Sequence, residues 1–182
     1  MTMKTKKLPI IIIAAALALT AALAGCSAKK DRTVPEGMKL ASDPELAGYT
    51  FFVPESWSVD IRTASTRAYC TGADKSSVMV MTGELEHTDS TVEGWWESGI
   101  DELKALYSDF ELISREDAEL DGAKGEKFVY SGTFDGTQFK YSQVAAVKGG
   151  VIYVVTYGAT ADRWDSHLEE FSSMIGNFRF GK

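Results

Sequence analysis

Histidine and cysteine are scarce in this sequence, which contains two of each in 182 residues. HExxH, GxSxG, P-loop and paired-cysteine motifs are absent, and with them the usual signatures of metallopeptidases, serine hydrolases and nucleotide-binding enzymes. Basic residues are also few: 19 Lys and Arg stand against 26 Asp and Glu, a formal net charge of -7. An acidic protein repels phosphate backbones, so nucleic acid is not expected as a partner. We expect no cofactor either.

A long hydrophobic run occurs only near the N-terminus. Met1–Lys7 carries three lysines and no acid, and Leu8–Leu23 is apolar apart from Pro9 and Thr20. This run is shorter than the ~20 residues that a membrane-spanning helix needs. A basic start followed by a short apolar run is typical of an export signal peptide.

The run ends in Leu23-Ala24-Gly25-Cys26, which resembles the lipobox of bacterial lipoproteins at every position. The resemblance implies that the Cys26 thiol is joined to diacylglycerol and that a peptidase cleaves between Gly25 and Cys26. Residues 1–25 would then be a signal peptide, and lipid would hold the protein at the outer, extracytoplasmic face of the cell membrane. The alternative is an uncleaved N-terminal anchor in which Cys26 is merely a small apolar residue.

The chain after Cys26 is expected to contain a tether and one domain. Residues 26–46 show no sustained period and include Pro35 and Pro44, which favours a flexible tether. The alternative is that residues 38–46 pack on the edge of the domain. Apolar residues make up 45% of the sequence, so residues 47–182 can bury a core and form one domain.

Short β-rich segments between turn residues account for most of the expected domain. We predict that Tyr49–Val53 and Trp57–Arg62 form an opening hairpin around Pro54. Asp121-Gly122, Asp135-Gly136 and Gly149-Gly150 are strong hairpin signals and predict an antiparallel meander. The other predicted strands are Ala68–Thr71, Ser77–Thr82, Phe110–Ser114, Lys127–Phe134, Gln138–Val147, Val151–Tyr157 and Asn177–Phe180.

Two amphipathic helices are predicted. The first begins at a capping box formed by Ser90 and Glu93, and the second covers Ala161–Ile175, capped by Thr160 and stopped by Gly176. The apolar stripe expected on the first helix consists of Val92, Trp96, Gly99, Leu103, Leu106 and Tyr107. Helices packed on an antiparallel sheet make an α+β fold.

The segment from Tyr49 to Trp57, a helix before Phe178-Arg179-Phe180, and Gly122 ahead of the meander together resemble the PsbP-like proteins. The resemblance covers Met38 to Phe180. It implies an antiparallel sheet flanked by helices. It also implies a non-catalytic protein, because members of this family dock on other proteins, including photosystem assemblies. No metal or docking residue of the family can be matched in this sequence.

Glu84, Glu86, His87 and Asp89 are the one candidate set of metal ligands, located between a strand and the first helix. Carboxylates and an imidazole can hold a divalent cation. However, His87 would point to the opposite side of the strand from Glu84 and Glu86, and acids before a helix N-terminus are favoured by the helix dipole. We therefore expect no metal here.

The remaining candidate residues have structural interpretations. Cys70 is the only other thiol, so no internal disulfide is expected once Cys26 is lipidated, and Cys70 is expected to be a buried strand residue. His167 lies beside the apolar stripe of the last helix and is expected to be a half-buried edge residue. Trp95 lies at the margin of the first helix's stripe and could anchor a partner.

These observations favour a membrane-anchored, extracytoplasmic, non-catalytic binding or accessory module. Its partner would be another envelope protein or a small ligand. The alternative is a cell-envelope hydrolase that uses carboxylates, for which the sequence provides no named residues.

Overall fold

The computed structural model describes a single folded unit within Val34–Lys182. The residues described are 33–60, 65–85, 87 and 90–181. The predicted signal peptide, Gly25, Cys26 and Glu86 lie outside the described residues. Within the part of the chain that is described, no helix is long and apolar enough to cross a membrane.

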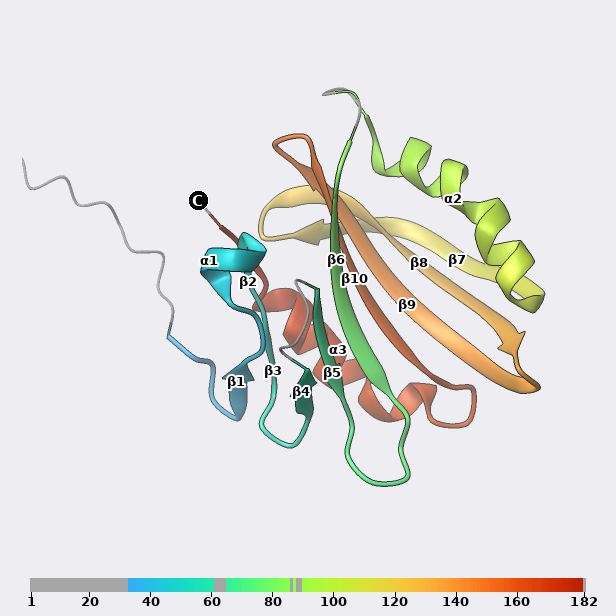
Figure 1. Cartoon of the computed structure of the whole chain (residues 1–182), viewed down its shortest axis with the longest axis horizontal. Helices are drawn as coiled ribbons and strands as arrows, with labels where there is room; N and C mark the ends of the chain where they lie inside the picture. The colour runs from blue at the N-terminus through green and yellow to red at the C-terminus, as the bar shows by residue number, and fades with distance from the viewer. Residues whose placement is uncertain (1–32, 61–64, 86, 88–89, 182) are drawn as a thin grey trace, which may run out of the picture. The chain divides into compact units, whose positions relative to one another are not determined.

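A seven-stranded antiparallel sheet forms the centre of this unit (Figure 1). Its strands are β4 (Ser58–Asp60), β5 (Thr66–Tyr69), β6 (Ser77–Glu84), β7 (Ser108–Leu120), β8 (Ala123–Phe134), β9 (Thr137–Lys148) and β10 (Val151–Thr160). Their spatial order is β4-β5-β6-β10-β9-β8-β7, so the last four strands form a meander and β6 pairs with its final strand. The antiparallel sheet and the meander confirm the main part of the predicted α+β fold.

The three predicted hairpin turns of the meander are confirmed. Asp121 and Asp135 have positive φ angles of 44° and 47°, and each is followed by a glycine with positive φ. Gly149 and Gly150 also have positive φ angles. Two successive positive φ angles match the right-handed twist of the flanking strands, which explains the Asp-Gly and Gly-Gly sequences.

The predicted opening hairpin is wrong. β3 (Phe52–Pro54) pairs with β1 (Met38–Leu40), whereas β4 pairs with β5. The physical reason is burial on both sides of the chain: Phe51, Phe52 and Val53 are all almost inaccessible, so this segment enters the core instead of lying at a sheet edge. β2 (Tyr49–Thr50) pairs separately with β11 (Arg179–Phe180).

The second half of the predicted tether is folded onto the domain. β1 forms a strand pair there, and α1 (Pro44–Ala47) follows it with Asp43 as its N-cap. Met38 is 7% exposed and belongs to the core. The alternative, in which residues 38–46 pack on the domain edge, is the arrangement observed, so any tether ends before β1.

Two further helices flank the sheet, with starts that differ from those predicted. In α2 (Val92–Leu106), Thr91 is the N-cap and its Oγ1 accepts a 3.1 Å hydrogen bond from the Gly94 amide. The predicted capping box of Ser90 and Glu93 is therefore wrong, and Glu93 instead forms a 3.2 Å ion pair with Arg115.

The last predicted helix is shorter than expected. Thr160 belongs to β10 and caps nothing, and a turn and a 3-10 helix, η1 (Trp164–His167), precede α3 (Leu168–Gly176). In α2, Trp96 is buried as predicted, but Leu106 is 52% exposed, whereas Leu103 and Tyr107 on either side of it pack on the cluster beneath the helix.

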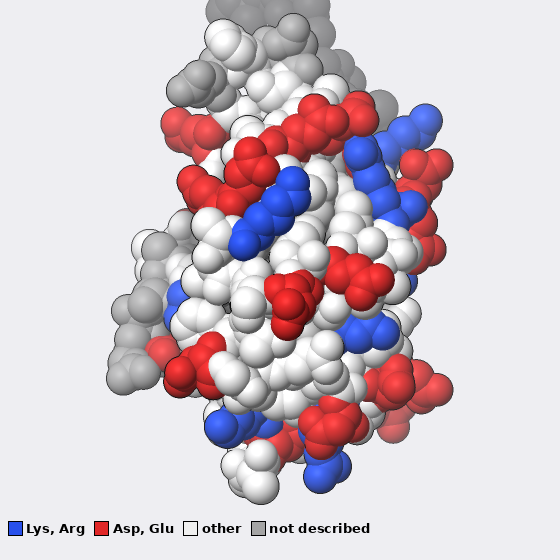
Figure 2. Space-filling view, turned by 90° about the vertical axis from the view of Figure 1, so that its right-hand side faces the viewer, with Lys and Arg blue, Asp and Glu red and all other residues white. Residues whose placement is uncertain are grey.

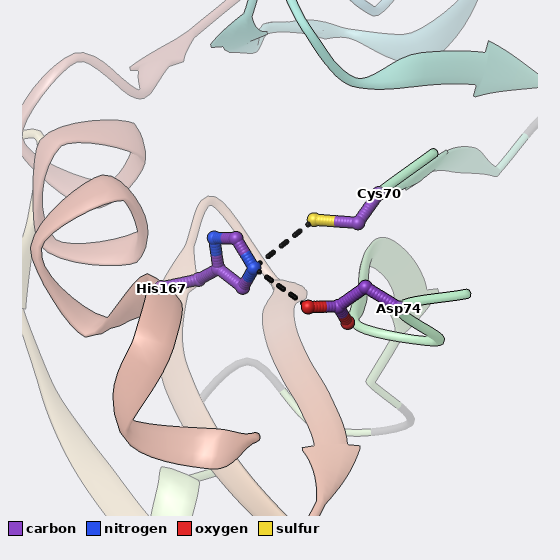
Figure 3. A group of neighbouring side chains, drawn as sticks. All are labelled: Cys70, Asp74 and His167. Carbon is purple, nitrogen blue, oxygen red and sulfur yellow. Dashed lines mark hydrogen bonds and ion pairs between the residues drawn. The ribbon is translucent and has the colours of Figure 1, made fainter. Parts of the chain in front are cut away.

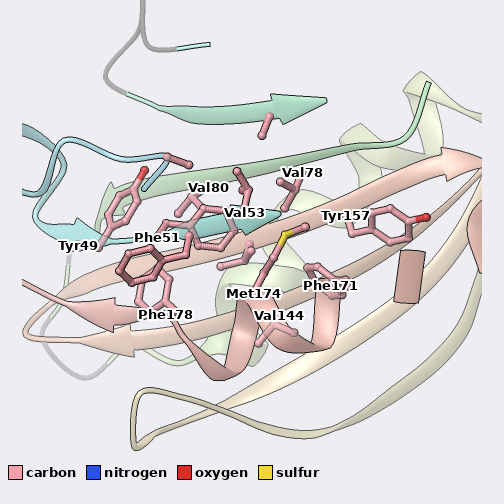
Figure 4. Packing of buried hydrophobic residues seen from close by; sticks show 14 of the residues in the cluster. Tyr49, Phe51, Val53, Val78, Val80, Val144, Tyr157, Phe171, Met174 and Phe178 are labelled. Carbon is pink, nitrogen blue, oxygen red and sulfur yellow. The ribbon is translucent and has the colours of Figure 1, made fainter. Parts of the chain in front are cut away.

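The two faces of the sheet carry separate hydrophobic clusters, because neighbouring residues of a strand point to opposite faces. One cluster lies between the sheet, the β2–β3 segment and α3 (Figure 4). The other lies beneath α2 and contains Trp96, Phe128 and Tyr130. We call these two sides the α3 face and the α2 face.

Candidate functional site

The metal ligands proposed from the sequence do not come together. Glu84 and His87 are both exposed, and Glu86 and Asp89 lie outside the described residues. Among the residues described, one group of His, Cys, Asp and Glu side chains is close enough to share an ion, and it consists of Cys70, Asp74 and His167. Their ligand atoms all lie within 4.8 Å of one another.

His167 is the centre of this group (Figure 3). Its Nε2 lies 3.4 Å from Cys70 Sγ and 3.1 Å from Asp74 Oδ2. Cys70 directly follows β5 and Asp74 lies in the turn before β6, while His167 is the last residue of η1. Cys70 is half-buried and lies just after the strand, whereas the sequence suggested a buried strand residue. His167 is half-buried, as predicted.

A second layer of contacts fixes the His167 ring. Its Nδ1 lies 2.6 Å from Glu170 Oε2, and the buried Trp57 donates a 3.1 Å hydrogen bond from Nε1 to the same oxygen. The Trp57 and His167 rings meet edge to face at 5.5 Å. We call Cys70, Asp74, His167 and Glu170 the His167 cluster.

The protonation states of the His167 cluster argue against nucleophilic catalysis. Burial, together with the charges of Asp74 and Glu170, raises the pKa of Cys70 to about 12, so the thiol stays protonated at neutral pH. Burial lowers the pKa of His167, but hydrogen bonds to the two carboxylates outweigh this effect and the net shift is upward. An activated Cys–His dyad needs a thiol with a lowered pKa, whereas here the pKa of the Cys70 thiol is raised.

Asp74 is equally unsuited to acid catalysis. The interaction of Asp74 with Ser76, whose amide donates a 2.8 Å hydrogen bond to it, and its contact with His167 lower the pKa of Asp74 to about 2. A general acid that works near neutrality needs a pKa shifted in the other direction.

Sequence reasoning missed this group because its members are distant in the chain. Cys70 and His167 are 97 positions apart, and neither belongs to a recognisable motif. The nearest signal was local: Gly72, Asp74 and Ser76 form a turn that holds Cys70 close to Asp74.

A second feature is a pocket of about 240 Å³ on the α2 face, lined by residues of β5, β6, β9 and β10. Tyr141 and Thr156 lie on the same side of their strands as Ala145 and Val154, which pack beneath α2. Its lining residues are Arg67, Tyr69, Ser77, Val78, Met79, Tyr141, Thr156 and Gly158.

Gly158 makes room for one wall of this pocket. A Cβ atom at this position would lie 2.6 Å from the Tyr141 ring, so only glycine lets that ring lie over β10. The Tyr107 hydroxyl then donates a 3.0 Å hydrogen bond to the Tyr141 hydroxyl. Tyr69 in the lining is 39% exposed, and Met81, two positions after the lining residue Met79, is 40% exposed.

The surface charge agrees with the acidic composition. Figure 2 shows the side of the molecule that faces right in Figure 1, where acidic and basic side chains are interspersed and acidic ones predominate. No continuous basic patch is visible on this side, which is what nucleic-acid binding would require.

Trp95, the candidate anchor predicted from the sequence, is half-buried and packs against the edge of the cluster beneath α2. Its neighbour Trp96 is 4% exposed and stacks on Phe128 with ring centroids 4.0 Å apart. The two tryptophans thus differ in burial as the helix phase predicted. A partner-binding role for Trp95 stays a prediction.

No protein-family profile and no curated protein matches this sequence. Solved structures do share its fold. The solution structure of cyanobacterial PsbP (CyanoP) from Synechocystis sp. PCC 6803 is 19% identical, with a TM-score of 0.57 over 82% of this chain and 96% of that one. This likeness supports the PsbP-like fold expected from the sequence.

Two other structures are similar at lower identity. LpqN of Mycobacterium tuberculosis, described as involved in cell envelope biogenesis, is 14% identical, with a TM-score of 0.57 over 80% of this chain and 91% of that one. The Ran-binding protein Mog1p of Saccharomyces cerevisiae is 9% identical, with a TM-score of 0.57 over 79% of this chain and 95% of that one. At these identities the likeness is one of fold.

Proposed function

We propose that this chain is a lipid-anchored, extracytoplasmic accessory module that binds another envelope protein through the open part of its α2 face. The observation that carries the proposal is the pocket, whose lining includes Met79 and Tyr69, the latter 39% exposed. Met81, 40% exposed, follows Met79 on the same face of β6. A pocket with an exposed aromatic wall can receive an apolar side chain of a partner.

The pocket is better suited to a protein than to a free small molecule. Its volume of about 240 Å³ is below the ~300–1,000 Å³ typical of small-molecule sites. Its lining combines Tyr69, Met79 and Arg67, and Tyr, Met and Arg are the residue types enriched in protein interfaces. The partner would place an apolar side chain in the pocket and a carboxylate near Arg67.

The proposed location is supported by the sequence Leu23-Ala24-Gly25-Cys26 after a short apolar run. In this proposal cleavage between Gly25 and Cys26 leaves a diacylated cysteine, and the chain up to β1 separates the domain from the membrane. The likeness to an envelope-biogenesis protein and to a Ran-binding protein is in keeping with an accessory role.

No observation favours the alternative of a carboxylate hydrolase. The two carboxylates that meet at His167 are engaged with its ring, and Asp74 has a depressed pKa. The proposal is therefore a non-catalytic one.

Site-specific photocrosslinking in the native membrane tests the proposal. A photoreactive residue at Met81 should capture one protein, whereas the same residue at Leu46, which is 82% exposed on α1, should not. Arg67→Glu and Tyr69→Ala should each abolish capture at Met81, because they remove the charge and the aromatic wall. Equal capture at both positions, no capture at Met81, or capture that survives both substitutions would contradict the proposal.

A further inference from the structure

The side chains of the His167 cluster are of the types that bind metal ions, and hydrogen bonds from neighbouring residues hold them in place. We propose that Cys70, Asp74 and His167 bind one divalent ion of the zinc class, through Sγ, one carboxylate oxygen and Nε2, with solvent as the fourth ligand. This inference is independent of the proposed protein partner, because the cluster and the pocket involve different side chains.

Two of the three distances between ligand atoms match those around a tetrahedral ion. With metal–ligand distances of about 2.3 Å to sulfur and about 2.0–2.1 Å to nitrogen and oxygen, a tetrahedron puts S and N about 3.5 Å apart and N and O about 3.3 Å apart. The observed distances are 3.4 Å from Sγ to Nε2 and 3.1 Å from Nε2 to Oδ2. The third pair, Cys70 Sγ and the Asp74 carboxylate oxygen, lies within 4.8 Å, so Cys70 or Asp74 must move by up to about 1.3 Å to reach the ~3.5 Å of a tetrahedron.

The second layer of the cluster is the type that supports a metal-bound histidine. Such a histidine usually donates its other ring N–H to a carboxylate, which fixes the tautomer and the ring orientation. Here Glu170 Oε2 lies 2.6 Å from Nδ1, and Trp57 holds that carboxylate from the core. This arrangement leaves Nε2 directed at Cys70 and Asp74, as a ligand nitrogen must be.

The turn that carries the other two ligands is held in place by its own hydrogen bonds. The Cys70 amide donates to the Ser76 carbonyl at 2.9 Å, and the Ser76 amide donates to Asp74 Oδ1 at 2.8 Å. Oδ1 is thus engaged by the backbone, and Oδ2 is the oxygen that faces His167.

The donor set selects the class of ion. A thiolate with an imidazole and one carboxylate suits Zn²⁺ and its substitute Co²⁺, whereas Mg²⁺ and Ca²⁺ prefer oxygen ligands. On binding, the S–H proton of Cys70 and the Nε2–H proton that His167 directs at Asp74 both leave to solvent, and metal–sulfur and metal–nitrogen bonds replace the two bonds broken. The side chains of His167 and Asp74 are 20% and 21% exposed, so an ion and a water ligand can reach the site.

Cobalt spectroscopy tests the site directly. In the full chain carrying Cys26→Ser, where Cys70 is the only thiol, one equivalent of Co²⁺ should produce a sulfur-to-cobalt charge-transfer band and tetrahedral visible bands. Added Zn²⁺ should abolish them. Cys70→Ser, Asp74→Asn and His167→Ala should each eliminate or strongly weaken this signal, whereas His87→Ala, which removes the other histidine, should preserve it.

A milder pair of variants covers the case in which a ligand variant fails to fold. Glu170→Gln should weaken zinc affinity by about 10- to 100-fold, as expected for a residue that orients a ligand. Glu169→Gln, at an exposed neighbouring position, should leave it unchanged. No band in the folded parent chain would overturn the proposal and leave only a polar network. Binding that is indifferent to both His167→Ala and Glu170→Gln would overturn it as well.

Discussion

Trp95 and Trp96 are sequence neighbours whose side chains differ by about 100° around the axis of α2. Trp96 stacks on Phe128 and is almost inaccessible, so Trp96→Ala should lower the free energy of unfolding by about 3–5 kcal/mol. Trp95→Ala, at a half-buried position, should cost about 1 kcal/mol or less. Urea melts of both variants measure the difference, and equal losses would contradict the helix phase seen in the structure.

Adding a single Cβ atom at Gly158 tests whether the Tyr141 ring, which forms a wall of the pocket, needs a glycine beneath it. Gly158→Ala should force the Tyr141 ring off β10 and break its hydrogen bond with Tyr107, at a cost of about 1–3 kcal/mol. Gly83→Ala is the matched control in β6, because its Cβ would make only a 3.4 Å contact with Ile152. Thermal melts should show a clear loss for the first variant and almost none for the second.

At the scale of elements, the position of β1 decides where the folded domain begins. Met38 is 7% exposed and Leu40 is 44% exposed, although both belong to this short strand. Met38→Ala should therefore destabilise the domain by about 2 kcal/mol or more, and Leu40→Ala by far less. If both substitutions left the denaturation midpoint unchanged, residues 38–46 would be part of a tether after all.

Sequence patterns predicted the elements that depend on local signals. The three turns of the meander follow from Asp-Gly and Gly-Gly pairs, because positive φ is required at residues that can adopt it. The buried face of α2 follows from helical spacing, although Leu106 does not belong to it: Leu106 is exposed, while Leu103 and Tyr107 pack on the cluster beneath the helix.

Arrangements that depend on distant parts of the chain were not predictable in this way. Burial of Phe52 and Val53, which point to opposite sides of the strand, depends on β1 and α3, so local alternation led to the wrong partner for β3. The His167 cluster also depends on a contact between distant parts of the chain, because Cys70 meets the 3-10 helix at His167, 97 positions away. No local sequence pattern predicts such a contact. Glu84 and His87 were candidates because they are close in sequence, but the structure does not group them with other ligands.

At the scale of the whole molecule, the two proposed binding sites lie on opposite faces of the sheet. Tyr69 contributes to the pocket on the α2 face, while its neighbour Cys70 packs against the cluster on the α3 face. Adjacent strand residues point to opposite faces, which explains how one short segment serves both sites. Arg67→Glu should therefore abolish partner capture without changing cobalt binding. His167→Ala should abolish cobalt binding without changing partner capture.

The proposed membrane attachment concerns the whole molecule, and in this proposal it depends on one residue. If Cys26 is the lipidated N-terminus, detergent-extracted protein should have the mass of residues 26–182 plus a diacylglycerol group, with or without a further acyl chain. Cys26→Ser should leave the precursor uncleaved, because a hydroxyl is too weak a nucleophile to accept the lipid.

Two acyl chains would hold the protein firmly, since each buried CH₂ contributes about 0.8 kcal/mol and a single chain gives only marginal binding. Cys70→Ser is the matched control, because it removes the other thiol and should leave processing and membrane fractionation unchanged. Intact-mass spectrometry of the three proteins decides the question. An unmodified N-terminus at any residue other than Cys26, or normal processing of Cys26→Ser, would show that the protein is not anchored in this way.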